Sequence, residues 1–153
     1  MRFMITSTPG ENYDPKTAAP PGVSVIEAHM KFNEEMHNAG VLVAAEGLNP
    51  AGKQARVGVK NGKRVVLDGP FAETKELIGG FYLIDVKSRE EAIAWAMRCP
   101  TGLGFDEVLT ILQMTDAEDL PPEMLSLIER CAPIWSKTFS KVRRSSKAVS
   151  AER

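Results

Sequence analysis

The stretch "GGFYLIDVKSREEAIAWAMRCP", residues 79–100, combines a strand and a helix from which the fold can be inferred. Residues 79–86 are rich in aromatic and aliphatic side chains, as is typical of a strand. Ser88, with Glu91 three positions later, matches a capping box, which begins a helix. This helix is predicted to run to about Cys99 and to end at Pro100. The Gly79–Gly80 pair before the strand would permit a close approach of two backbones.

Two further strands and another helix precede this unit in the sequence, and one strand follows it. Strands are predicted over residues 2–8, 41–48 and 105–114. A helix is predicted over 23–39, because apolar positions recur there at helical spacing and Gly40 follows as a C-terminal stop. The stripe on one face of this helix consists of Val25, His29, Phe32, Met36 and Ala39.

Residues 54–68 form the clearest local signal. Two β-rich runs flank Asn61–Gly62, a dipeptide that suits the positive φ angles of a type I′ hairpin turn. When this hairpin is set aside, the order of elements is β-α-β-β-α-β. The sequence therefore predicts an α+β, ferredoxin-like fold with an inserted β-hairpin.

Both faces of the predicted sheet are apolar. Phe81 and Leu83 alternate with Tyr82 and Ile84, and residues 105–114 show the same pattern. Two helices can cover only one face, so the other needs a second cover. A second copy of the chain is the simplest cover, and a predicted helix over 121–130 is the alternative. We therefore expect a homodimer.

Composition indicates one globular domain with an uneven charge distribution. The 153 residues are 43% hydrophobic and 25% charged, and the net charge of −1 argues against a general nucleic-acid binder. Residues 133–153 contain six Lys or Arg and one Glu, a net of +5, which leaves −6 on the rest. No apolar run is long enough to span a membrane, and no signal peptide is recognisable.

The cysteines and the motifs of the sequence indicate which metals, cofactors and redox states to expect. Cys99 and Cys131 fit no metal-binding or redox spacing, so reduced thiols and a cytoplasmic location are expected. The sequence has no phosphate loop, nucleophile elbow or dinucleotide fingerprint. We therefore expect neither a metal nor a cofactor.

Several residues could form a site. His29 lies on the sheet-facing stripe of its helix, where an imidazole could transfer protons or be a buried core residue. Asp68 ends a strand before Gly69–Pro70 and could be a catalytic acid or a turn residue. Glu46, near another strand end, could line a pocket or face solvent. We predict that His29, Asp68 and Glu46 converge on one pocket, with Phe71 as its wall.

Three quoted stretches resemble one family. "DGPFAETKELIGGFYLIDV" (68–86), "HMKFNEEMHNAGVLVAAEGLNP" (29–50) and "EEAIAWAMRCP" (90–100) are similar to the DGPF branch of the YCII-related family. The resemblance covers about residues 1–114. It implies a ferredoxin-like subunit that pairs through its sheets as a dimeric α+β barrel. It also implies an active site with a histidine and an aspartate.

Of the two active-site residues that the resemblance implies, this chain has only the histidine at the family's position. The histidine corresponds to His29, but the acid of shorter members corresponds to Asn38, which cannot act as a base. Asp68 of the DGPF motif is then the remaining acid, and Glu46, Phe71 and Tyr82 are the predicted substrate-binding residues. Some relatives look like enzymes that act on small acidic molecules by proton transfer. Others are associated with extracytoplasmic-function sigma factors.

Two functions of different class follow. One is a small-molecule enzyme that uses His29 and Asp68 as acid-base groups. The other is a non-catalytic ligand-binding or regulatory protein linked to sigma-factor systems. Residues 1–115 are the predicted family domain. Residues 116–153 are expected to add a short helix and a basic, flexible tail.

Overall fold

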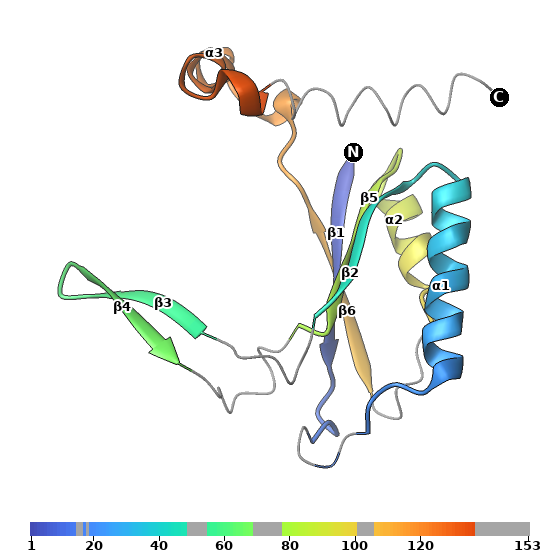
Figure 1. Cartoon of the computed structure of the whole chain (residues 1–153). Coiled ribbons are helices and arrows are strands. Elements are labelled where there is room, and N and C mark those ends of the chain that lie inside the picture. The colour runs from blue at the N-terminus through green and yellow to red at the C-terminus, as the bar shows by residue number, and fades with distance from the viewer. Residues whose placement is uncertain (15–16, 18, 49–54, 69–77, 101–105, 137–153) are drawn as a thin grey trace.

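A four-stranded antiparallel sheet, covered on one face by two helices, forms the body of the protein (Figure 1). The computed structural model describes residues 1–14, 17, 19–48, 55–68, 78–100 and 106–136. The strands lie in the order β2-β5-β1-β6, so the predicted ferredoxin-like β-α-β-β-α-β fold is confirmed. Its elements are β1 (Arg2–Pro9), α1 (Val23–Asn38), β2 (Leu42–Gly47), β5 (Gly80–Asp85), α2 (Arg89–Ala96) and β6 (Glu107–Gln113).

The core lies between the helices and the sheet. Phe3 and Ile84 on the central strands are almost fully buried, and Met36 of α1 packs into the same cluster. Burial of one such side chain contributes about 1.5–3 kcal/mol. The buried residues of α2 are the small Ala92 and Ala96, and the partly buried Trp95 packs against the same core.

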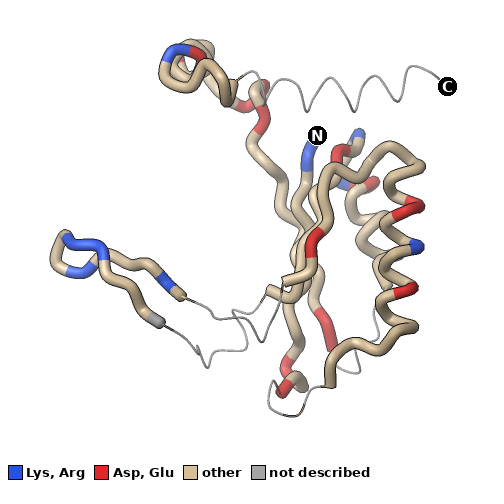
Figure 2. Tube along the Cα trace, viewed as in Figure 1, with Lys and Arg blue, Asp and Glu red and all other residues tan. Residues whose placement is uncertain are grey.

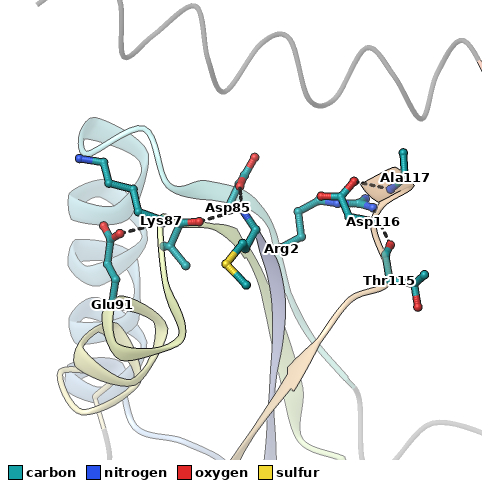
Figure 3. Close-up of polar contacts among 9 residues, drawn as sticks. Arg2, Asp85, Lys87, Glu91, Thr115, Asp116 and Ala117 are labelled. Atoms are coloured by element: carbon teal, nitrogen blue, oxygen red, sulfur yellow. Dashed lines mark hydrogen bonds and ion pairs between the residues drawn. The ribbon is translucent and has the colours of Figure 1, made fainter. Parts of the chain in front are cut away.

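The ends of the two helices follow their sequence signals. Gly40 follows α1 with a φ of 71°, a left-handed conformation that favours glycine. Ser88 Oγ accepts a hydrogen bond from the Glu91 backbone N–H at 3.2 Å, as the capping box predicts. The Glu91 carboxylate accepts instead from the Lys87 N–H at 2.8 Å, one residue before the cap (Figure 3).

The inserted hairpin consists of β3 (Ala55–Lys60) and β4 (Lys63–Asp68). Asn61 and Gly62 have φ angles of 51° and 74°, so the predicted turn with two positive φ angles is confirmed. The hairpin lies apart from the four-stranded sheet, on the side away from α1 (Figure 1). Its valines are therefore exposed, among them Val57 at 61% and Val66 at 64%.

The sheet face opposite the helices, which we call the open face, has no cover among the described residues. Val108 and Leu112 of β6 lie on it and are 54% and 50% exposed. The C-terminal helix α3 (Pro122–Cys131), preceded by the 3-10 turn η2 (Ala117–Asp119), lies beyond one end of the sheet (Figure 1). Since α3 has no buried residue, it does not cover the open face.

Polar contacts tie the segment before α3 to the body (Figure 3). The Arg2 guanidinium donates to the Thr115 carbonyl at 3.3 Å, and the Asp116 side chain accepts from the Ala117 N–H at 2.9 Å. At the same end, the Met1 ammonium group pairs with Asp85 at 3.0 Å. None of the helices in the described part of the chain is long and apolar enough to cross a membrane.

Candidate functional site

His29 and Tyr82 meet between α1 and the sheet. His29 Nδ1 lies 2.8 Å from the Tyr82 hydroxyl oxygen, which is hydrogen-bonding distance. His29 precedes the buried Phe32 by three residues, so both side chains lie on the face of α1 that packs on β5. The imidazole is only partly buried, and among the described residues it has no second hydrogen-bond partner.

Burial keeps the Tyr82 phenol protonated. Desolvation raises the pKa of Tyr82 far above its usual value, and the Cys99 thiol and the Glu107 carboxylate raise it further. The ring also meets Phe32 edge to face, with centroids 5.7 Å apart and planes at 89°. The phenol is thus held in one orientation as a neutral hydrogen-bonding group.

Cys99 and Glu107 complete the group, which we call the Tyr82 cluster: Ser7, His29, Tyr82, Cys99 and Glu107. Burial raises the pKa of the Cys99 thiol to about 11, with a further contribution from Glu107, while a hydrogen bond from Tyr82 opposes the increase. The Glu107 carboxylate accepts a hydrogen bond from the Ser7 hydroxyl. The cluster therefore joins α1, β1, β5, β6 and the end of α2.

Glu46 lies on the other side of the sheet from His29. Ala45 pairs with Tyr82, so Glu46, paired with Phe81, points to the open face and is exposed. The reason is a β-bulge between Leu42 and Ala44, which reverses the alternation of side chains along β2. Within one chain, the predicted convergence of His29 and Glu46 is wrong.

The remaining predicted residues are less fully described. The Asp68 backbone ends β4, where it pairs with Ala55, but its side chain and Phe71 lie outside the described residues. His37, on another face of α1, is exposed. Gly80 has the expected close approach, since an added Cβ would lie 2.8 Å from the Glu46 carbonyl oxygen.

Glu107 and Cys99 were missed from sequence. Glu107 could have been found, because it alternates with Leu109 and Ile111 and so shares their sheet face. Cys99 gave no such signal, since its position depends on how the end of α2 packs against β6. The described residues contain no group of three or more His, Cys, Asp or Glu side chains arranged to hold a metal ion.

The fold and the sheet-facing histidine define an α+β, ferredoxin-like domain with a cluster of titratable groups beneath α1. A family model of the YCII-related domain matches residues 1–115. The chain therefore belongs to the YCII-related family, as its sequence suggested. Its assignment to the DGPF branch stays a prediction.

Two individual similarities accompany the family match. An uncharacterised protein of Rhizobium meliloti strain 1021 is 47% identical over 58 residues, which is 38% of this chain and 47% of that relative. The match thus spans about half of the relative's length. A solved structure of 5-chloro-2-hydroxyhydroquinone dehydrochlorinase from Burkholderia phenoliruptrix AC1100, in complex with 2,5-dihydroxybenzoquinone, covers 79% of this chain and 100% of that chain. The TM-score is 0.43 and the identity 13%.

The raised pKa of Cys99 predicts slow alkylation in the folded protein. With a pKa of about 11, about a thousandth of the thiol is ionised near pH 8, against roughly a quarter for an unperturbed cysteine. In a Cys131→Ser variant, Cys99 should react with iodoacetamide roughly two orders of magnitude more slowly when folded than in urea. The folded rate should rise with pH up to about 11. Equal rates in the two states would contradict the buried placement.

Proposed function

We propose that the protein is a small-molecule enzyme in which His29 transfers protons as a general acid-base group. The observation that carries this proposal is the 2.8 Å hydrogen bond between His29 Nδ1 and Tyr82. A hydrogen bond to one ring nitrogen orients an imidazole and selects its tautomer. The other nitrogen, Nε2, then faces the substrate.

In the proposed mechanism His29 is a base rather than an acid at rest. A phenol can both donate and accept, so the Tyr82 hydroxyl can direct its own hydrogen away from His29. The Tyr82 oxygen can then accept from the His29 Nδ1–H. This arrangement leaves Nε2 unprotonated, so it can remove a proton from a substrate and return it in a later step.

Two acids are proposed as partners of this histidine. Asp68 is the acid of the DGPF motif, and it ends β4 after the hairpin. Glu107 lies on the helix-covered face and acts on the Tyr82 phenol, so it would influence His29 indirectly. Asp68 would be a second acid-base group, whereas Glu107 would be a positioning residue.

The modest rate enhancement of acid-base catalysis limits how unreactive the substrate can be. Positioned acid-base catalysis contributes typically ~10²–10⁴-fold, which suffices only for an activated substrate. A small acidic molecule with an activated bond, such as a lactone or an enol acid, fits this limit. Removal of a proton next to a carbonyl group, followed by its return, is the reaction class that we propose.

Loss of the His29 imidazole should strongly reduce turnover, whereas loss of His37, a second histidine on the same helix, should not. After a thermal-shift screen of small carboxylic acids and lactones on the wild type, kcat should fall ~10²–10⁴-fold in His29→Ala. His37→Ala is the control, because His37 is exposed on another face of the same helix. Equal loss in both variants, or full activity in His29→Ala, would refute the assignment.

The same assay separates the two acids. Asp68→Asn should reduce kcat and alter the pH profile if Asp68 is an acid-base group. Glu107→Gln should instead shift the pH profile through Tyr82 with a smaller loss of kcat. If neither variant differs from the wild type, His29 works without an acid partner.

A second function is ligand binding without turnover, as in a regulatory protein of a sigma-factor system. The Tyr82 hydroxyl already occupies His29 Nδ1, so the pair could serve as a fixed hydrogen-bonding site for a ligand. A ligand that raises the melting temperature of the wild type but is recovered unchanged would favour this function.

We also propose that a second copy of the chain covers the open face, so that two sheets stack as a dimeric α+β barrel. Exposed side chains of β6, such as Val108 at 54% and Leu112 at 50%, support this pairing. A cytoplasmic location accompanies the proposal, because Cys99 and Cys131 are both free.

A further inference from the structure

One face of the inserted hairpin exposes three valines together with Arg64, which pairs with Val59. Val57, Val59 and Val66 share one face in the observed register and are 61%, 64% and 64% exposed. An isolated two-stranded hairpin is marginally stable in water, so this face is expected to need a partner surface. The hairpin is called the arm below.

The arm is also strongly basic. Its two strands carry Arg56, Lys60, Lys63 and Arg64 against one acid, Asp68 at the end of β4, and Figure 2 shows these cations along the arm. Two of them, Lys60 and Lys63, flank the turn at its tip on the face opposite the valines, whereas Arg64 lies on the valine face. A surface that binds the arm should therefore combine apolar side chains with negative charge.

The segment around η2 and α3 has both properties. From Asp116 to Cys131 the chain carries five acids and a single base, Arg130 in the last turn of α3. In α3, Met124 and Leu127 are 45% and 43% exposed. The Arg2–Thr115 contact holds the start of this segment at the sheet end, on the opposite end from the arm (Figures 1 and 3).

The geometry points to a second copy of the chain as the occupant. The arm and α3 both lie on the open-face side, at opposite ends of the sheet (Figure 1). In a two-fold stack of open faces, the arm must approach either the partner's arm or the partner's α3. Contact between the two arms would bring their basic tips together, which is unfavourable. Contact between an arm and the partner's α3 would instead bring basic side chains close to acidic ones.

We infer that the arm of each protomer packs against the η2–α3 segment of its partner, and that this exchange selects the antiparallel stacking of the two sheets. The contact rests on the proposed homodimer but not on catalysis by His29. Each dimer would contain two such contacts, one at either end. The arm would thereby contribute partner specificity as well as buried apolar area.

A charge exchange between two variants tests this contact. The first variant is Lys60→Glu/Lys63→Glu, and the second is Glu118→Lys/Glu123→Lys. In the homodimer of either variant, the arm and the partner's η2–α3 segment would carry charges of the same sign. The homodimer Kd of each variant should therefore rise at least about tenfold. Mixed together, the two should form a heterodimer with near wild-type affinity, because both of its arm contacts are then complementary. Native mass spectrometry with one variant isotopically labelled measures the pairing.

Controls separate the possible failures. Lys31→Glu/Arg89→Glu makes the same change in net charge on the helices and should dimerise like the wild type. If the first variant binds the wild type more tightly than the wild type binds itself, arm pairs with arm and the inference is wrong. If the wild type is a dimer and both variants dimerise with the same Kd as the wild type, the arm contact is wrong but the pairing of the sheets stands. A monomeric wild type would overturn the sheet pairing too, while the His29 assay would remain a separate test.

Discussion

Val108→Glu/Leu112→Glu is expected to yield a folded monomer at concentrations where the wild type is a dimer. Both side chains lie on the open face and are about half exposed in the single chain. Stacking of two sheets would place glutamates at these positions between the sheets, where an unpaired charge costs several kcal/mol. The dimer Kd should rise by more than about 100-fold, as measured by sedimentation velocity.

The matched control changes apolar residues on the helix side of the protein. Val23→Glu/Met97→Glu replaces side chains that are 83% and 82% exposed, and it should sediment like the wild type. Circular dichroism of both variants should show an unchanged fold. If the wild type is already a monomer at micromolar concentration, the proposed homodimer is wrong.

Phe32→Ala should cause the largest loss of stability, about 3–5 kcal/mol. Phe32 is 5% exposed, packs edge to face on Tyr82, and lies 6.0 Å from the Trp95 ring. Arg98 lies over that Trp95 ring at 4.6 Å and pairs with Glu35, so Phe32 lies where α2 meets α1. At the scaling for a domain of this size, the melting temperature should fall by roughly 6–20 °C.

Met30→Ala on the same helix is its control, because Met30 is 55% exposed and should change stability by less than about 0.5 kcal/mol. Both variants should be compared at one protein concentration, since the proposed dimerisation would stabilise the folded state by mass action. A fall of less than a few degrees in Phe32→Ala would mean that the ring is not a core element.

Most of the fold could be predicted because its signals are local. The spacing of His29, Phe32 and Met36 assigned one face of α1 to the sheet, and the hydrogen bond to Tyr82 agrees with it. Asn61–Gly62 predicted the hairpin turn, since both φ angles must be positive there. Such patterns require only neighbouring residues.

The site was harder to predict because it depends on contacts between distant elements. Cys99 approaches Tyr82 only through the packing of α2, and Glu107 enters through the pairing of β6 with β1. Glu46 was expected near His29 because it lies close to a strand end, which does not determine the face of the sheet; simple alternation from Leu42 would also put it on the helix side. The bulge in β2 is invisible to that rule.

This bulge also bears on how relatives of different length could evolve. Val43 is the extra residue of β2, since Leu42 pairs with Ile84 and Ala44 already pairs with Leu83. Loss of that one codon would straighten the strand and still leave Ala45 opposite Tyr82 and Glu46 opposite Phe81. A single-residue gap at this place in an alignment of homologues would therefore be neutral for the residues beneath α1. A gap at Ala45 with the bulge retained would instead bring Glu46 opposite Tyr82, beneath α1.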